Sequence, residues 1–148
     1  YRELKEYKSA IETFLEARTL FKSAHEVIQV ARCDQKLAHC YVELLDAESA
    51  LRYAQKSADV FATAHDQRRL MYASFELGRA QVLNGDIDEG LSTIERVLDV
   101  ATESDMREFE FIVIIEKKIA EILHSIGRSD EAAEIERRIS SVTEILED

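Results

Sequence analysis

Apolar residues recur with the period of an α-helix along almost the entire chain, and this pattern constrains the fold more than any other feature. Apolar positions three or four residues apart form seven successive stripes, and no stretch keeps the alternation of a β-strand. Short polar breaks therefore predict about seven helices, whose short links make neighbours antiparallel. The breaks fall near residues 23–26, 46–48, 65–67, 84–88, 103–105 and 127–129.

The composition favours an all-α chain with a buried core. The 148 residues are 46% hydrophobic and include four glycines and no proline, whereas a β-sandwich or barrel needs turn residues every few positions. This apolar fraction is too high for a disordered chain. No apolar run approaches the roughly 18–20 residues that cross a bilayer, so we predict no membrane association. We expect one domain over residues 1–148.

The net charge narrows the classes of possible partner, and the two cysteines indicate the cellular compartment. The formal net charge is −11, and an acidic chain binds phosphate backbones poorly, so we predict no direct nucleic-acid contact. Cys33 and Cys40 are seven residues apart, about 10 Å along a helix and beyond disulfide reach. Unpaired thiols fit the cytoplasm. The chain starts at Tyr1 with the helical pattern running by Leu4, so we expect a fragment of a longer protein.

An internal repeat of about 40 residues organises the stripes into helix pairs. A small residue recurs in the second helix of each pair with spacings of 40, 40 and 42, at Ala10, Ala50, Gly90 and Ala132. A small side chain lets two helices approach closely, which explains a helical glycine despite a propensity loss of about 1 kcal/mol. About three and a half pairs fit the chain, and the first shows only its second helix. The first helices align through Leu37-Ala38, Leu77-Gly78 and Ile119-Ala120.

The repeat unit has a large residue followed by a small one, then a turn glycine and a small residue five positions later. This pattern resembles the tetratricopeptide repeat (TPR). Leu77-Gly78 with Gly85 and Gly90 carries the pattern best. The repeats are longer than the usual 34 or so residues, and the closing proline is absent. Asp34, Ser74 and Glu116 replace the tryptophan-type residue. The resemblance implies a right-handed α–α superhelix; HEAT or armadillo solenoids are the alternative fold.

The TPR resemblance also implies a concave groove, lined by the first helices, that grips a protein or peptide. Three basic side chains against one acidic one suggest a locally basic groove for an acidic peptide. Ordinary solvated or locally paired side chains are the alternative interpretation. The set of residues with which TPR domains clamp a C-terminal carboxylate includes an asparagine, and that asparagine is absent here. The predicted groove residues are Arg32, Gln35, His39, Tyr72, Phe75, Arg79, Lys117, Glu121 and His124.

Residues 109–115 form the most apolar stretch, and six nearly consecutive apolar residues cannot share one helix face. They suggest either packing on both sides of a helix or an interface patch for a partner or self-association. The β-branched run makes a strand a minor alternative. The candidate patch residues are Phe109, Phe111 and Ile112.

Catalytic, metal and cofactor sites are not predicted. Cys33, His39 and Cys40 lack metal-ligand spacing, and no phosphate loop, nucleophile motif or dinucleotide fingerprint occurs. We therefore expect a non-enzymatic protein-binding scaffold. The alternative is a sensor segment of a multi-domain bacterial transcription regulator or signalling ATPase. An upstream nucleotide-binding loop or helix-turn-helix would favour that alternative.

Overall fold

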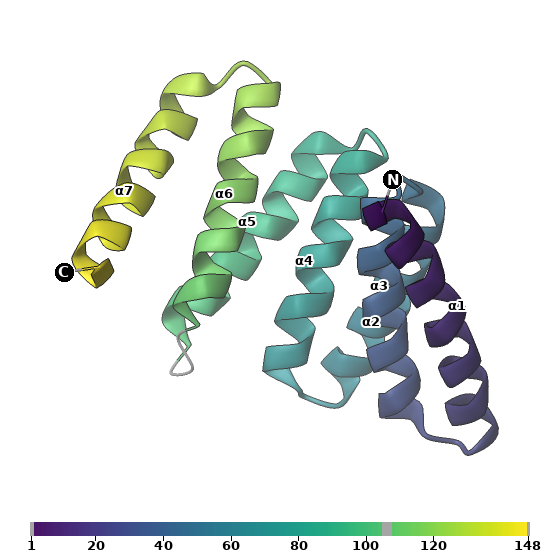
Figure 1. Ribbon diagram of the computed structural model, residues 1–148. Helices are drawn as coiled ribbons and strands as arrows, with labels where there is room; N and C mark the ends of the chain where they lie inside the picture. The colour runs from purple at the N-terminus through teal and green to yellow at the C-terminus, as the bar shows by residue number, and fades with distance from the viewer. Residues whose placement is uncertain (1, 105–107, 148) are drawn as a thin grey trace. The chain divides into compact units, whose positions relative to one another are not determined.

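The computed structural model describes residues 2–104 and 108–147, without the side chains of residues 142, 143, 146 and 147 (Figure 1). This part of the chain contains seven α-helices and no strand, as predicted. Within the described residues, each predicted break overlaps a link between two helices; residue 105 of the break at 103–105 lies outside them. The helices are α1 (Arg2–Ser23), α2 (Val27–Glu43), α3 (Ala47–Thr63), α4 (Gln67–Leu83), α5 (Ile87–Glu103), α6 (Phe109–Ser125) and α7 (Ser129–Glu147).

Five of the helix ends have the same left-handed turn. At the link after α4, the Gly85 N–H donates to the Val82 carbonyl at 3.0 Å, and the following N–H reaches the carbonyl five residues back. This hydrogen-bond pattern satisfies the last carbonyls of the helix. It confirms Gly85 as the turn glycine, with a φ angle of 94°, and Gly127, in the predicted break at residues 127–129, has a φ angle of 81°. The same pattern recurs at three residues that are not glycine: His25, Leu45 and His65.

The next helix often begins directly behind such a turn with a side-chain cap. The Asp46 carboxylate accepts a hydrogen bond from the Ser49 N–H at 3.1 Å, and Asp66 accepts one from the Arg69 N–H at 3.1 Å. Each aspartate satisfies a donor that the first turn of a helix leaves unpaired. Turn and cap together fix where one helix stops and the next starts.

Replacing Leu45 with glycine is expected to stabilise the protein by about 0.5–1 kcal/mol. Leu45 has φ 62° and is 75% exposed, so the leucine is strained and buries little surface. Glycine adopts this conformation without a Cβ clash. Leu45→Ala is the control, because alanine keeps the Cβ and should gain much less. Urea unfolding of both variants measures the difference, and equal stabilities would contradict the strain argument.

The chain divides into two compact units, Tyr1–Thr93 and Ile94–Asp148. In the first unit, consecutive helices from α1 to α4 pack on one another, and α2 also packs on α4. Its core includes the fully buried Leu37, Ala54 and Phe61. In the second unit α6 packs on α7. Ile115 and Ala132 are fully buried there.

Gly90 is a close-packing residue, as the repeat predicted. A Cβ built on Gly90 would lie 2.7 Å from the Gly78 carbonyl oxygen and 2.5 Å from Cγ2 of Val82. Real Cβ atoms essentially never approach neighbours this closely. Contact between the backbones of α4 and α5 in the first unit therefore requires a glycine at this repeat position.

Within the described residues, no helix combines the length and hydropathy needed to cross a membrane.

Candidate partner-binding site

The first unit brings six of the predicted groove residues onto two packed helices. Arg32, Gln35 and His39 lie on α2, and Tyr72, Phe75 and Arg79 lie on α4. Their exposure differs: Arg32 is exposed, the His39 side chain is 41% exposed, and the Arg79 side chain is 15% exposed. The two helices therefore expose some of these side chains to solvent and hold others between them.

Arg79 is the centre of a charged network between α2 and α4. Its Nη2 donates to Glu43 Oε1 of α2 at 2.6 Å, and its Nη1 donates to Glu76 Oε2 at 3.0 Å. The Glu76 side chain is only 7% exposed. Burial opposes the charge on Arg79, but the attraction of Glu76 and Glu43 outweighs it and raises the pKa of Arg79. The guanidinium is thus charged and fixed by two carboxylates.

His39 joins the same network from α2. Its Nδ1 lies 3.1 Å from Glu76 Oε1 and 3.3 Å from Nη1 of Arg79, so its tautomer decides whether it donates or accepts. The imidazole also makes an edge-on contact with the ring of Tyr7 from α1, with centroids 6.0 Å apart. The negative charge of Glu43 raises the pKa of Tyr7. Three helices therefore hold the His39 ring.

Arg79 differs from the free groove cation that the sequence suggested. Glu43 and Glu76 compensate its charge, and neither was among the predicted groove residues. Arg32 keeps its head group in solvent, with one hydrogen bond of 3.2 Å to Gln29. The basic character of this face therefore depends on Arg32 more than on Arg79.

The two aromatic candidates on α4 have different roles. Phe75 is 5% exposed, and the Arg79 guanidinium lies 5.8 Å from its ring centre, so Phe75 packs beneath the charged network. Tyr72 is half-buried, and the Arg68 guanidinium lies 5.9 Å from its ring centre. Tyr72 is therefore the more accessible of the two aromatic side chains.

The other three predicted groove residues lie in the second unit, on one surface pocket. Lys117, Glu121 and His124 of α6 line a cavity of about 470 Å³ between α6 and α7. Nε2 of His124 lies 2.7 Å from a carboxylate oxygen of Glu136, and Lys118 donates to Glu121 at 3.1 Å. The remaining lining residues are Ala120, Glu136, Ile139 and Ser140.

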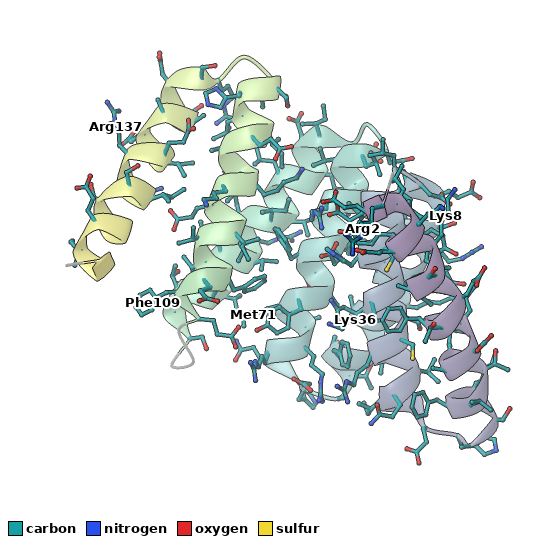
Figure 2. All side chains as sticks on the ribbon, in the orientation of Figure 1. Arg2, Lys8, Lys36, Met71, Phe109 and Arg137 are labelled. Atoms are coloured by element: carbon teal, nitrogen blue, oxygen red, sulfur yellow. The ribbon has the colours of Figure 1, made fainter. Side chains whose placement is uncertain are left out.

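The apolar run at residues 109–115 belongs to α6, so the strand alternative is wrong. Phe109 is 52% exposed, and Figure 2 shows it at the beginning of α6. Phe111 is half-buried, whereas Ile112 is 9% exposed and belongs to the core of the second unit. Ile114, at 53%, is the other exposed apolar residue of the run. The surface part of this candidate patch is therefore smaller than the sequence suggested.

Sequence reasoning missed the acidic half of the network. Glu76 and Arg79 are three residues apart on one helix, which is a spacing that brings opposite charges together, so this pair had a local signal. Glu43 lies 36 residues from Arg79 and Tyr7 lies on another helix, so nothing local identifies either.

The two cysteines lie in the interior of the first unit. Cys33 and Cys40 are free and buried on α2, and burial raises the pKa of both thiols. A raised pKa keeps a thiol protonated and unreactive. The described residues contain no group of three or more His, Cys, Asp or Glu side chains arranged to hold a metal ion.

Comparisons with known proteins match the fold. No protein-family model matches the chain. No curated protein matches it either. Two crystal structures of a protein from Podospora anserina, assigned as a kinesin light chain with nearly identical TPR-like repeats, are similar to this chain. One of the two is the structure of a point variant. TM-scores are 0.77 and 0.76 at 16% identity, covering 96% of this chain and 69% of those chains. The chain therefore has the all-α, helical-repeat fold of TPR-like proteins.

Proposed function

We propose that this chain is a non-enzymatic protein-interaction module that binds a peptide across the face formed by α2 and α4. The fold supports this in general terms, because the similar structures are TPR-like repeat proteins and stacked helical repeats provide extended binding surfaces. The observation that carries the proposal is the difference in exposure among the side chains of this face. Arg32, His39 and Tyr72 stay accessible, while Arg79 is fixed between Glu43 and Glu76.

The chemistry of the accessible side chains favours an acidic peptide with an apolar residue. The Arg32 guanidinium can donate two parallel hydrogen bonds to a carboxylate. Tyr72 occupies the equivalent position one repeat later, and its ring offers an apolar surface. The Arg79 network contributes fixed geometry, because its hydrogen bonds are already made before a partner arrives. Two buried free thiols fit a reducing compartment, so we place this function in the cytoplasm.

Arg32→Glu and Tyr72→Ala are each expected to weaken peptide binding about tenfold, as loss of an interface anchor does. A display library of random 12-residue peptides supplies the ligands, and fluorescence anisotropy measures their affinities. Arg52→Glu is the matched control, because Arg52 is an exposed arginine on α3. Arg79 is unsuitable as a test position, because its replacement would leave the buried Glu76 carboxylate without its charge partner.

The peptides enriched on the parent chain are expected to contain Asp or Glu near an apolar residue. The proposal fails if no peptide is enriched, or if the enriched peptides bind Arg32→Glu and Tyr72→Ala as tightly as they bind the parent chain. Circular dichroism confirms that both variants remain helical.

A further inference from the structure

A separate pocket lies within the first unit, between the C-terminal halves of α1 and α3 and the N-terminal half of α2. Its volume is about 470 Å³, which is in the range of small-molecule sites. Every residue of its lining belongs to these three helices or to the link between α1 and α2. None of the predicted groove residues lines it, so this pocket is distinct from the α2/α4 face.

The ion pair of Arg18 and Asp34 forms the buried polar part of the pocket. Nε of Arg18 donates to Oδ1 of Asp34 at 2.5 Å, and the two side chains are 19% and 2% exposed. Within the described residues, neither Nη of Arg18 nor Oδ2 of Asp34 makes a hydrogen bond, yet none of these atoms is sealed from solvent. The pair therefore keeps two donor groups and one acceptor for a ligand.

The charges of the whole lining are balanced. It carries three charges of each sign beside the imidazole of His25, from Arg18, Lys22, Lys56, Glu26, Asp34 and Asp59. Asp59 accepts a hydrogen bond from a side-chain amide of α3 at 2.8 Å. Lys22, Lys56 and Glu26 make no ion pair within the part of the chain that the structure describes. A ligand that carries both a positive and a negative charge therefore complements this lining better than a simple anion or cation does.

Three valines give the same pocket an apolar wall. Val27 and Val30 come from α2, where their spacing of three residues places them on one side of the helix, and Val60 comes from α3. Val27 is 61% exposed, and the other two are half-buried. Covering these side chains with another aliphatic group would remove apolar surface from water. The wall therefore favours a ligand with an aliphatic part.

We propose that this pocket binds a free amino acid with an aliphatic side chain, such as leucine. The carboxylate of the amino acid pairs with the two Nη groups of Arg18, the ammonium group pairs with Oδ2 of Asp34, and the aliphatic side chain packs on the valines. Lys22 and Lys56 add positive charge beside the carboxylate. This site is independent of the peptide-binding function proposed for the α2/α4 face.

The ligand side of the test uses leucine and analogues that each lack one of its groups, with isothermal titration calorimetry on the whole chain. We expect leucine to bind. We expect 4-methylpentanoate, which lacks the ammonium group, and 3-methylbutylamine, which lacks the carboxylate, to bind at least about tenfold more weakly, because each leaves one member of the Arg18–Asp34 pair without a partner. Glycine, which lacks the aliphatic side chain, should also bind about tenfold more weakly.

The protein side of the test leaves the Arg18–Asp34 pair intact, because breaking it would destabilise the fold. Lys22→Gln and Lys56→Gln are each expected to weaken leucine binding about fivefold by removing positive charge near the carboxylate. Lys8→Gln is the matched control and should leave binding unchanged. Lys8 is exposed on α1, does not line the pocket, and lies about 21 Å along the helix from Lys22 (Figure 2).

The proposal is overturned if leucine at about 10 mM gives no binding heat, or if either charge-deficient analogue binds as tightly as leucine. Unchanged affinity in both Lys22→Gln and Lys56→Gln also overturns it, because leucine would then bind elsewhere. Arg32→Glu should leave leucine binding unchanged, since Arg32 does not line this pocket. Failure of this proposal is thus distinguishable from failure of the peptide-binding function.

Discussion

The chain carrying Arg18→Met is expected to lose about 3 kcal/mol of unfolding free energy, because the change leaves a carboxylate buried without its charge partner. Nε of Arg18 in α1 donates to Oδ1 of Asp34 in α2 at 2.5 Å. The Asp34 side chain is 2% exposed, and that of Arg18 is 19% exposed. The hydrogen bond to Asp34 raises the pKa of Arg18, which is consistent with a fixed charge pair. Urea unfolding measures the loss.

Two further variants separate the effect of the unpaired buried charge on stability from the effect of lost side-chain packing. In Arg18→Met with Asp34→Leu no charge is stranded, so most of the stability should return. Arg2→Met is the exposed control: Arg2 and Glu6 are 3.6 Å apart with side chains 94% and 67% exposed, and the expected change is below about 0.5 kcal/mol. A loss in Arg18→Met no larger than that of the control would contradict the argument.

Gly90→Ala is expected to lose about 2 kcal/mol of unfolding free energy, although alanine is the better helix former by about 1 kcal/mol. The added methyl would overlap the Gly78 carbonyl oxygen and the Val82 backbone nitrogen, which lie 2.7 and 2.9 Å from its ideal position. Backbone atoms cannot move aside as a flexible side chain can, so α5 must shift away from α4. The same urea titration, followed by circular dichroism, measures this loss.

Ser92→Ala is the control for helix propensity, because Ser92 is exposed two residues along the same helix. It should change stability by less than about 0.5 kcal/mol. A Gly90→Ala chain as stable as the parent, or more stable, would show that α4 and α5 do not meet at this position.

The helix boundaries could be predicted because their signals are local. The Asn84-Gly85-Asp86 turn and the turn at Gly127 follow from a glycine that tolerates positive φ. The turn at Leu45 carries no such residue, yet it adopts the same left-handed conformation. This conformation goes against the preference of the leucine, so the break was predicted but the strain at Leu45 was not.

The candidate site could be predicted only in part. The repeat register assigns Arg32, His39, Tyr72 and Arg79 to the first helices of two pairs, and these helices, α2 and α4, pack together. Register says which positions are equivalent, but it does not give the neighbours of each side chain. The pairing of Arg79 with Glu43, across 36 residues, therefore had no sequence signal.

Three features were predictable from the sequence alone: the seven helices of the described residues, the repeat of about 40 residues, and the need for a small residue at Gly90. Helical periodicity, turn chemistry and small-residue spacing act within a few residues and are legible along the chain. Which charges are compensated emerged only from the packed helices. Arg18 of α1 pairs with buried Asp34 of α2, and Arg79 of α4 is fixed between Glu43 and Glu76. Burial and electrostatic pairing depend on side chains that folding brings together from distant helices.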